Sequence, residues 1–210
     1  MSDPHFGHAA VIQYSKRPFK SVEEMDEKLI RNWNSVVRPC DTTIVVGDFF
    51  MYHKKARLKE ILAALNGRKI LVRGNHDMSP SEMQTIGFDH VCESMTMKIA
   101  GERVNISHYP YRRPWWWIKF YQIMNRFFPK RFWRPRIFQN QLKPDGNFLI
   151  HGHTHSVNKA TPDKKMIHVG VDAWDYKPVP IQKIGNMISE IRAGYYREDR
   201  KEEVRSDEKF

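Results

Sequence analysis

The sequence contains few cysteines and no apolar stretch at its beginning. Only Cys40 and Cys92 occur among its 210 residues, and neither belongs to a CxxC pair, so neither a disulfide framework nor a thiolate metal site is indicated. The chain runs directly into Asp3 and His5 without the apolar region of a secretory signal, so we expect a cytoplasmic protein. Any metal site would have to use histidine, aspartate and asparagine, and the sequence has 10 histidines.

Acidic residues are absent from one long segment of the chain. From Arg112 to Lys143 there are nine lysines and arginines and no aspartate or glutamate, so this segment holds nine of the net +11 charges. The C-terminal stretch 197–210 mixes both signs of charge and is typical of a solvated tail without a specific role. The charge asymmetry favours an anionic substrate or partner near the basic segment.

The basic segment is also rich in aromatic residues, in the sequence RRPWWWIKFYQIMNRFFPKRFWRPRIFQNQLK. Lys119, Gln122, Asn125 and Arg126 recur at three- and four-residue intervals, which predicts a helix with one narrow polar face. Residues 115–128 are too few to cross a bilayer, which needs about 20 apolar residues. Three interpretations stay open: packing as a lid or against a second subunit, binding to a membrane surface, and binding of single-stranded nucleic acid. We place packing first, the membrane second and nucleic acid third.

Hydrophobic periodicity predicts alternating helices and short strands within one domain. Residues 21–37 repeat apolar side chains at helical spacing behind Ser21, which can cap a helix, and residues 53–67 form a second amphipathic stretch ended by Gly67. A β-hairpin over residues 95–110 is expected to turn at Ala100 and Gly101. Further short apolar strands are predicted within residues 42–48, 69–77, 147–155 and 166–172.

Residues that can bind metals follow these strands at their carboxyl ends. In an open α/β sheet those ends form one rim, so side chains far apart in the sequence can meet there. Glycines beside the clusters allow tight turns that bring the side chains close. The clusters that follow strands are Gly47-Asp48, Gly74-Asn75-His76-Asp77, Ser107-His108 and His151-Gly152-His153-Thr154-His155, and DPHFGH from Asp3 to His8 provides a fifth loop.

These motifs, DxH, GD, GNHD, a single histidine and GHxH in this order, resemble the calcineurin-like metallophosphoesterase superfamily from Asp3 to His155. The resemblance implies an α/β (α+β) fold, a two-sheet β-sandwich flanked by helices with a dinuclear metal site at strand ends. The metallophosphoesterase domain would span residues 1–196 with a basic aromatic insertion at 112–145, followed by the charged tail 197–210. One metal would be held by Asp3, His5, Asp48 and His155, and the other by Asp48, Asn75, His108 and His153, with Asp48 as the bridge.

The resemblance also implies a reaction. Two divalent cations roughly 3.5–4 Å apart would activate a metal-bridging hydroxide that attacks the phosphorus of a phosphomonoester or phosphodiester. Imidazole and oxygen ligands suit Mn, Fe, Zn or Ni, and the family favours Mn. His76 would protonate the leaving oxygen or stabilise the transition state, with Asp77 oriented to tune it. His8 and Arg112 are candidate substrate-binding residues, and Asp172 is a candidate support behind the ligands.

Two features depart from the family pattern. Only Met1 and Ser2 precede Asp3, although the family carries this aspartate at the end of a first strand. Either the true start lies upstream, or the sequence is shortened, or the sheet lacks this strand, in which case we expect Asp3 and His5 to be poorly held. The second departure is the basic aromatic insertion itself. Two other functions therefore stay open: a catalytically silent binding scaffold with the same fold, and a peripheral membrane hydrolase of phospholipids or nucleotide-lipids.

Overall fold

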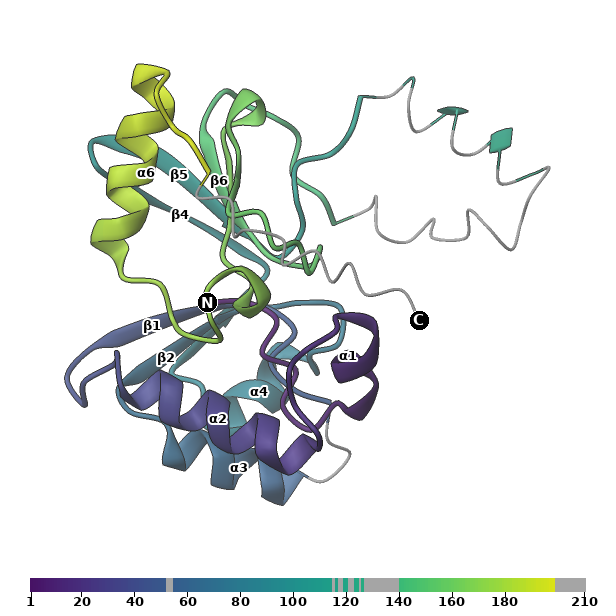
Figure 1. Ribbon diagram of the computed structural model, residues 1–210, viewed down its shortest axis with the longest axis vertical. Helices are drawn as coiled ribbons and strands as arrows, with labels where there is room; N and C mark the ends of the chain where they lie inside the picture. The colour runs from purple at the N-terminus through teal and green to yellow at the C-terminus, as the bar shows by residue number, and fades with distance from the viewer. Residues whose placement is uncertain are drawn as a thin grey trace, which may run out of the picture.

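A computed structural model describes residues 1–51, 55–114 and 140–198, and between 114 and 140 it describes residues 116, 119, 120, 123, 124 and 126. Two β-sheets form the centre of the molecule, with helices on their outer sides (Figure 1). The strand order is β1-β2-β3 in the first sheet and β4-β5-β6-β8-β7 in the second. This mixed α/β sandwich is the fold class predicted from the sequence.

The first sheet is parallel, and helices cover one of its faces (Figure 1). Side chains alternate between the two faces of a strand. Val45, Leu71 and Val91 therefore pack with the helices, whereas Val46 and Val72 face the second sheet. The elements of this half are α1 (Ala9–Tyr14), α2 (Val22–Asn34), β1 (Thr42–Val46), α3 (Lys55–Ala64), β2 (Arg68–Val72), α4 (Pro80–Ile86) and β3 (His90–Cys92).

The second sheet begins with the predicted hairpin, whose turn residues Ala100 and Gly101 both have positive φ. Its strands β5, β6 and β8 run parallel, so their carboxyl ends lie at one edge of the sheet. Apolar side chains of α6 pack into the same cluster as this sheet. The elements are β4 (Ser94–Ile99), β5 (Glu102–Ser107), β6 (Phe148–His151), β7 (Ala160–Thr161), β8 (Met166–His168) and α6 (Ile181–Ala193), with short 3-10 turns at Pro162–Lys164 and Val171–Ala173.

The helix predictions were partly successful. Ser21 caps α2 as expected, since its hydroxyl accepts a hydrogen bond from the N–H of Glu24. The predicted start of α3 at residue 53 lies outside the described residues. Helices α1 and α4 were not predicted, because 6 and 7 residues are too few for a periodic pattern. Across the described residues, no helix combines the length and the hydrophobicity needed to cross a membrane.

The first three residues of the chain link the two sheets. The carbonyl of Met1 accepts from the N–H of Val46 on β1 at 2.8 Å, and the N–H of Ser2 donates to the carbonyl of Val169 beyond β8 at 2.8 Å. Asp3 is fully buried and His5 is only 2% exposed. The expectation that these two ligands are poorly held was therefore wrong, because hydrogen bonds fix this short stretch from both sides.

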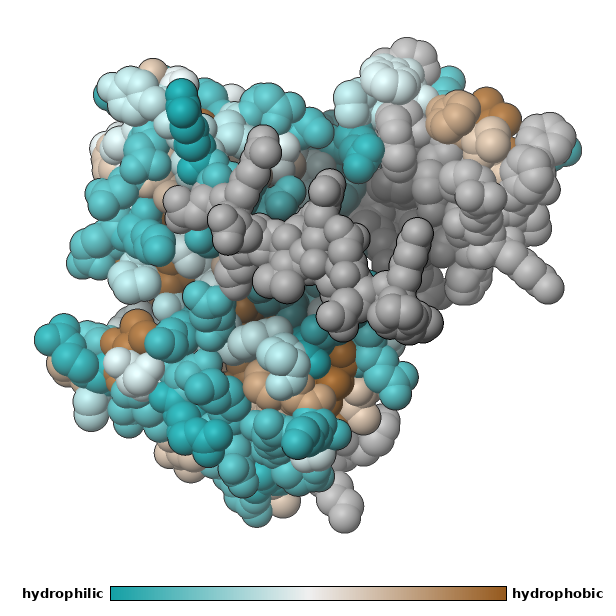
Figure 2. Space-filling view, in the orientation of Figure 1, coloured by the Kyte–Doolittle hydropathy of each residue, from teal (hydrophilic) through white to brown (hydrophobic). Residues whose placement is uncertain are grey.

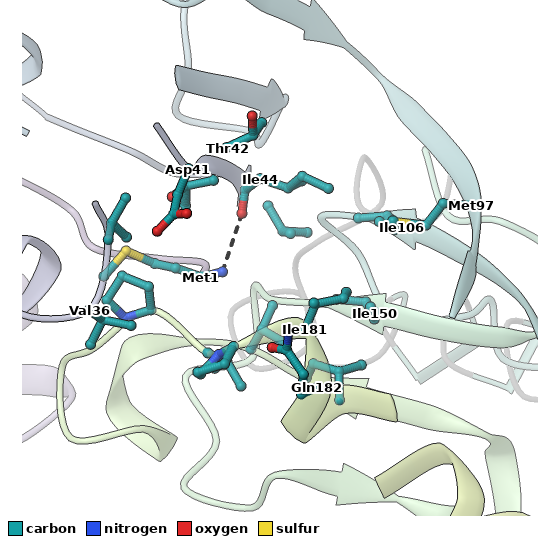
Figure 3. A pocket seen from close by; sticks show the side chains of 18 of the residues that line it. Met1, Val36, Asp41, Thr42, Ile44, Met97, Ile106, Ile150, Ile181 and Gln182 are labelled. Carbon is teal, nitrogen blue, oxygen red and sulfur yellow. Dashed lines mark hydrogen bonds between the residues drawn. The ribbon is translucent and has the colours of Figure 1, made fainter. Parts of the chain in front are cut away.

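A mainly apolar cleft of about 460 Å³ lies beside Met1, near the amino-terminal end of β1 (Figure 3). The amino group of Met1 donates to the carbonyl of Ile44 at 3.3 Å inside it, and burial lowers the pKa of this amino group to about 5. Ile106 and Ile150 line the cleft from the second sheet. None of the predicted metal ligands is among its lining residues, so the cleft is separate from the polar loops at the carboxyl ends of the strands.

Candidate metal centre

Three predicted ligands that are far apart in the sequence lie close together in the structure. Asp3 is the last of the three residues that link the sheets, His5 lies in the loop that follows it, and His155 lies in the loop after β6. Each offers one ligand atom, and these three atoms lie within 4.8 Å of one another. The Nε2 atoms of His5 and His155 are 3.2 Å apart. These residues form what we call the first ligand group.

The second ligand group lies at the ends of three strands. Asp48 follows β1, His108 follows β5 and His153 follows β6, and their ligand atoms are also within 4.8 Å of one another. Asn75, in the loop after β2, joins them, because its Oδ1 lies 3.2 Å from Nε2 of His108. All four loops therefore come from the shared rim at the carboxyl ends of the strands.

Asp48 lies between the two ligand groups. Its Oδ2 is 3.7 Å from Nε2 of His5 and 3.3 Å from Nε2 of His108. Its other oxygen, Oδ1, accepts a hydrogen bond from the N–H of His76 at 2.9 Å. One oxygen is thus held by the backbone while the other faces both groups, which is the arrangement that a bridging carboxylate needs.

The ligand loops have an uncommon backbone conformation. Five of the seven predicted ligands have positive φ, which costs a non-glycine residue roughly 1–2 kcal/mol and persists where the surrounding structure enforces it. Close glycine packing supplies part of that constraint. A Cβ atom on Gly74 would collide with the carboxylate of Asp48, and one on Gly47 would collide with the ring of His108. The residues with positive φ are Asp3, His5, Asp48, His153 and His155.

The carboxylate of Asp3 fits a site for a cation. Its Oδ2 accepts from the hydroxyl of Ser2 at 2.7 Å and from the N–H of His153 at 2.9 Å. Its Oδ1 is buried and has no hydrogen-bond partner among the described residues. An unpaired buried oxygen is costly, and a cation between the first-group ligands would satisfy it. The imidazole and oxygen donors of both groups fit a borderline divalent metal better than calcium.

The charged groups of the second ligand group shift one another's pKa. Burial lowers the pKa of His108, but the hydrogen bond to Asp48 and the charges of Asp3 and Asp48 outweigh it and raise this pKa to about 9. For Asp48, burial raises the carboxyl pKa, but the partner His108 and the N–H of His76 outweigh it and hold the pKa below its ordinary value. Burial raises the pKa of Asp3. Without metal, a protonated His108 therefore neutralises part of the negative charge.

Metal affinity should rise with pH up to about 9. Because the pKa of His108 is raised to about 9, this ring is protonated at neutral pH in the metal-free protein and must lose its proton to bind a cation. Below that pKa the competition of one proton weakens binding about tenfold per pH unit, and above it the dependence should level off. Calorimetric titration with Mn²⁺ at several pH values would measure this. An affinity that stays constant from neutral pH to pH 9 would contradict the expected proton release.

Asp77 has a different place from the one predicted for it. Its carboxylate accepts three backbone hydrogen bonds, from the N–H groups of Asp48 at 2.9 Å, Phe49 at 2.8 Å and Gly74 at 2.8 Å. The side chain is 6% exposed. The interpretation that Asp77 orients the ring of His76 is corrected, because its carboxylate instead ties together the loops that follow β1 and β2. Its position supports the loop that carries Asp48.

His76 and His8 border the ligand groups from the solvent side. The side chain of His76 is 40% exposed, and its Nε2 lies 3.9 Å from Oδ2 of Asp48. His8 contacts the first group, since its Nδ1 is 3.4 Å from Nδ1 of His5, and its Nε2 bonds the hydroxyl of Tyr14 at 3.1 Å. Tyr14, on the unpredicted helix α1, is 66% exposed and was missed as a residue of this rim.

The described contacts of Arg112 do not connect it to the ligand groups. Its N–H donates to the carbonyl of Leu142 at 2.8 Å, at the base of the insertion. Among the described residues, no hydrogen bond or ion pair joins its guanidinium to the ligand side chains. Substrate binding by Arg112 therefore stays a prediction.

Arg17 and Asp172 form a buried ion pair behind the first ligand group, and only Asp172 was predicted to support the ligands. Arg17 donates from Nε to Asp172 at 2.8 Å, and its guanidinium also donates to the carbonyls of Asp3 at 2.8 Å and Pro4 at 2.9 Å. Asp172 in turn lies 3.0 Å from Nδ1 of His155. A histidine that donates its Nδ1 hydrogen to a carboxylate presents a bare Nε2 to a metal. Asp172 therefore lies where a support for His155 was expected, whereas no sequence motif indicated Arg17.

Comparisons with known proteins agree with this geometry. A sequence model described as "Calcineurin-like phosphoesterase superfamily domain" matches residues 1–171. "Uncharacterized protein MJ1445" of Methanocaldococcus jannaschii is 31% identical over 194 residues, covering 90% of this chain and 89% of that protein. The Gene 66 protein of Mycobacterium phage L5 is 30% identical over 193 residues, covering 82% of this chain and 85% of that protein. The crystal structure of AQ665 from Aquifex aeolicus, a protein of unknown function, matches with a TM-score of 0.62 and 28% identity, covering 89% of this chain and 96% of that one.

Proposed function

Because this chain belongs to the calcineurin-like phosphoesterase superfamily, we propose that it is a metal-dependent phosphoesterase that hydrolyses a phosphomonoester or phosphodiester. The position of Asp48 carries the proposal, since its Oδ2 lies within 3.7 Å of Nε2 of His5 and 3.3 Å of Nε2 of His108. The buried, unpaired Oδ1 of Asp3 supports the same conclusion. Both features suit cations and have no other evident use in the described part of the chain.

The residues of the two groups would hold two divalent cations. When bound, such a pair lowers the pKa of a coordinated water molecule and polarises the phosphoryl oxygens of the substrate. We propose manganese first, with iron, zinc and nickel as alternatives, because the donors are imidazole nitrogens and hard oxygens. Asp3, His5, Asp48 and His155 would hold one cation, and Asp48, Asn75, His108 and His153 the other.

His76 is the residue best placed to move a proton. Its ring borders the second group through Asp48 and is also 40% exposed, so a substrate can reach it from solvent. Edge-on packing against His5, with ring centroids 5.5 Å apart, limits its orientation. We assign it the transfer of a proton to the leaving oxygen, a role that requires hydrogen-bond reach of that atom. His8 and Tyr14 would contact the substrate on the same rim.

The expected substrate is anionic. The basic segment begins at Arg112, close behind the ligand His108, and contributes positive charge without any acidic residue as far as Lys143. Such a field favours the approach of negatively charged molecules. We also propose a cytoplasmic location, in keeping with the free thiols of Cys40 and Cys92.

Hydrolysis of simple phosphoesters would test the proposed activity against the scaffold alternative. The protein loaded with Mn²⁺ should hydrolyse p-nitrophenyl phosphate, bis-p-nitrophenyl phosphate, or both, and the faster of the two indicates a monoester or diester preference. Chelation of the metal should stop turnover and added Mn²⁺ should restore it. The Asp48→Asn variant, purified in parallel, controls for a contaminating phosphatase. If no divalent metal supports turnover of either ester, the protein is better described as a binding scaffold.

A further inference from the structure

The basic segment leaves the domain between two strands that carry ligands. It starts after Tyr111, and the hydrogen bond from the N–H of Arg112 to the carbonyl of Leu142 closes its base. Its described helical residues lie away from both sheets (Figure 1). These residues are therefore accessible to another molecule or surface.

Three large hydrophobic side chains of this segment are exposed. Trp116 is 59% exposed, Phe120 is 55% exposed and Ile123 is 57% exposed. All three residues are helical, and their spacing of four and then three residues is the spacing of residues on one helix face. Figure 2 shows hydrophobic side chains at the surface among the described residues of this segment. These exposures argue against packing of the three side chains on their own domain, while packing against a second subunit stays a prediction.

Exposed basic residues flank these three residues along the chain. Arg113, Lys119 and Arg126 are exposed in the same segment, and the sequence from 112 to 143 contains no acidic residue. A second copy of this chain would bring like charges together, which disfavours a symmetric contact. A single-stranded nucleic acid would use the aromatic rings but gain no stacking from Ile123. An anionic bilayer fits both features, because its acyl boundary accepts aromatic and aliphatic side chains alike and its head groups attract lysine and arginine.

We propose that the face formed by Trp116, Phe120 and Ile123, together with Arg113, Lys119 and Arg126, docks the protein on an anionic membrane surface. The helix lies in the interface and does not span the bilayer. The proposal does not depend on the phosphoesterase activity, because none of these residues belongs to either ligand group.

Co-sedimentation with lipid vesicles tests this docking. Wild-type protein should sediment with vesicles that contain phosphatidylglycerol and stay in solution with vesicles of phosphatidylcholine alone, and high salt should weaken the binding. The triple variant Trp116→Ser, Phe120→Ser, Ile123→Ser should bind these anionic vesicles at least about tenfold more weakly, because three apolar side chains no longer enter the bilayer. The charge variant Arg113→Gln, Lys119→Gln, Arg126→Gln should lose about 100-fold.

Tyr195→Ser is the matched control, because Tyr195 is 71% exposed but lies after α6, outside the proposed docking face. This variant should bind vesicles like the wild type, and all variants should keep the wild-type melting temperature. The proposal is overturned if the wild type ignores anionic vesicles, or if both triple variants bind them unchanged. Binding to oligo(dT) without vesicle binding would assign the face to nucleic acid, and dimerisation abolished by the apolar variant, again without vesicle binding, would assign it to a second copy.

Discussion

Replacing Asp48 with asparagine should remove both the activity and much of the bound metal. The carboxylate Oδ2 lies between His5 and His108, so it is the atom that both ligand groups share. An amide keeps the shape, and its oxygen can still accept the hydrogen bond from the N–H of His76, but it carries no charge for the cations. Removing a hydrogen bond that only supports a metal ligand typically lowers metal affinity or activity by about 10–100-fold. Removing the bridging carboxylate should therefore reduce turnover by more than about 100-fold. Metal content by elemental analysis and hydrolysis of p-nitrophenyl esters measure the two effects.

His76→Ala is the informative comparison for that experiment. His76 contacts Asp48 through its backbone N–H, which alanine retains, and its ring belongs to neither ligand group. The variant should therefore keep its metal while turnover falls by about 10²–10⁴-fold, the usual contribution of a general acid or base. Equal metal loss in Asp48→Asn and His76→Ala would reassign His76 as a ligand or structural residue and remove the role proposed for it.

Arg17→Met should be the most destabilising of the substitutions considered. The side chain of Arg17 is fully buried and that of Asp172 is 5% exposed, so removing the cation leaves a buried carboxylate and two backbone carbonyls without their partner. Breaking a buried ion pair in this way typically costs 3–5 kcal/mol, so the free energy of unfolding should fall by about that amount. Metal affinity should also drop by about 10–100-fold, because Asp172 would no longer orient His155.

Arg31→Met provides the matched control. Arg31 pairs with Glu27 one helical turn away, but the two side chains are 63% and 67% exposed, so the pair contributes less than about 1 kcal/mol. Urea unfolding of the metal-free proteins compares the two variants, and titration with Mn²⁺ follows the affinity. If Arg17→Met unfolds at the same urea concentration as Arg31→Met, the buried pair does not stabilise the fold. If its metal affinity is also normal, Arg17 does not position the first ligand group.

Most of the candidate ligands could be identified from the sequence, because each of them is embedded in a short local pattern. Gly47-Asp48, Gly74-Asn75-His76 and His153-Thr154-His155 each follow an apolar strand, and parallel strands present their carboxyl ends at one rim. The short apolar strands and the capped helix α2 were recognised for the same reason, since their signals lie in neighbouring residues. Helix α6 carried such a signal as well, in Ile184, Met187, Ile188 and Ile191, and was overlooked.

The supports of the site were decided by the tertiary structure alone. Arg17 and Asp172 are 155 positions apart, and Asp77 is 29 positions from Asp48, so no local pattern links them. The same holds for the linking residues at the start of the chain, where Ser2 pairs with Val169. A sequence pattern records which residues share a strand or a helix face, whereas a hydrogen bond between loops depends on where packing of the two sheets brings each loop. The sequence by itself therefore determined the family and the candidate ligands, and the packed sandwich decided which buried groups hold those ligands in place.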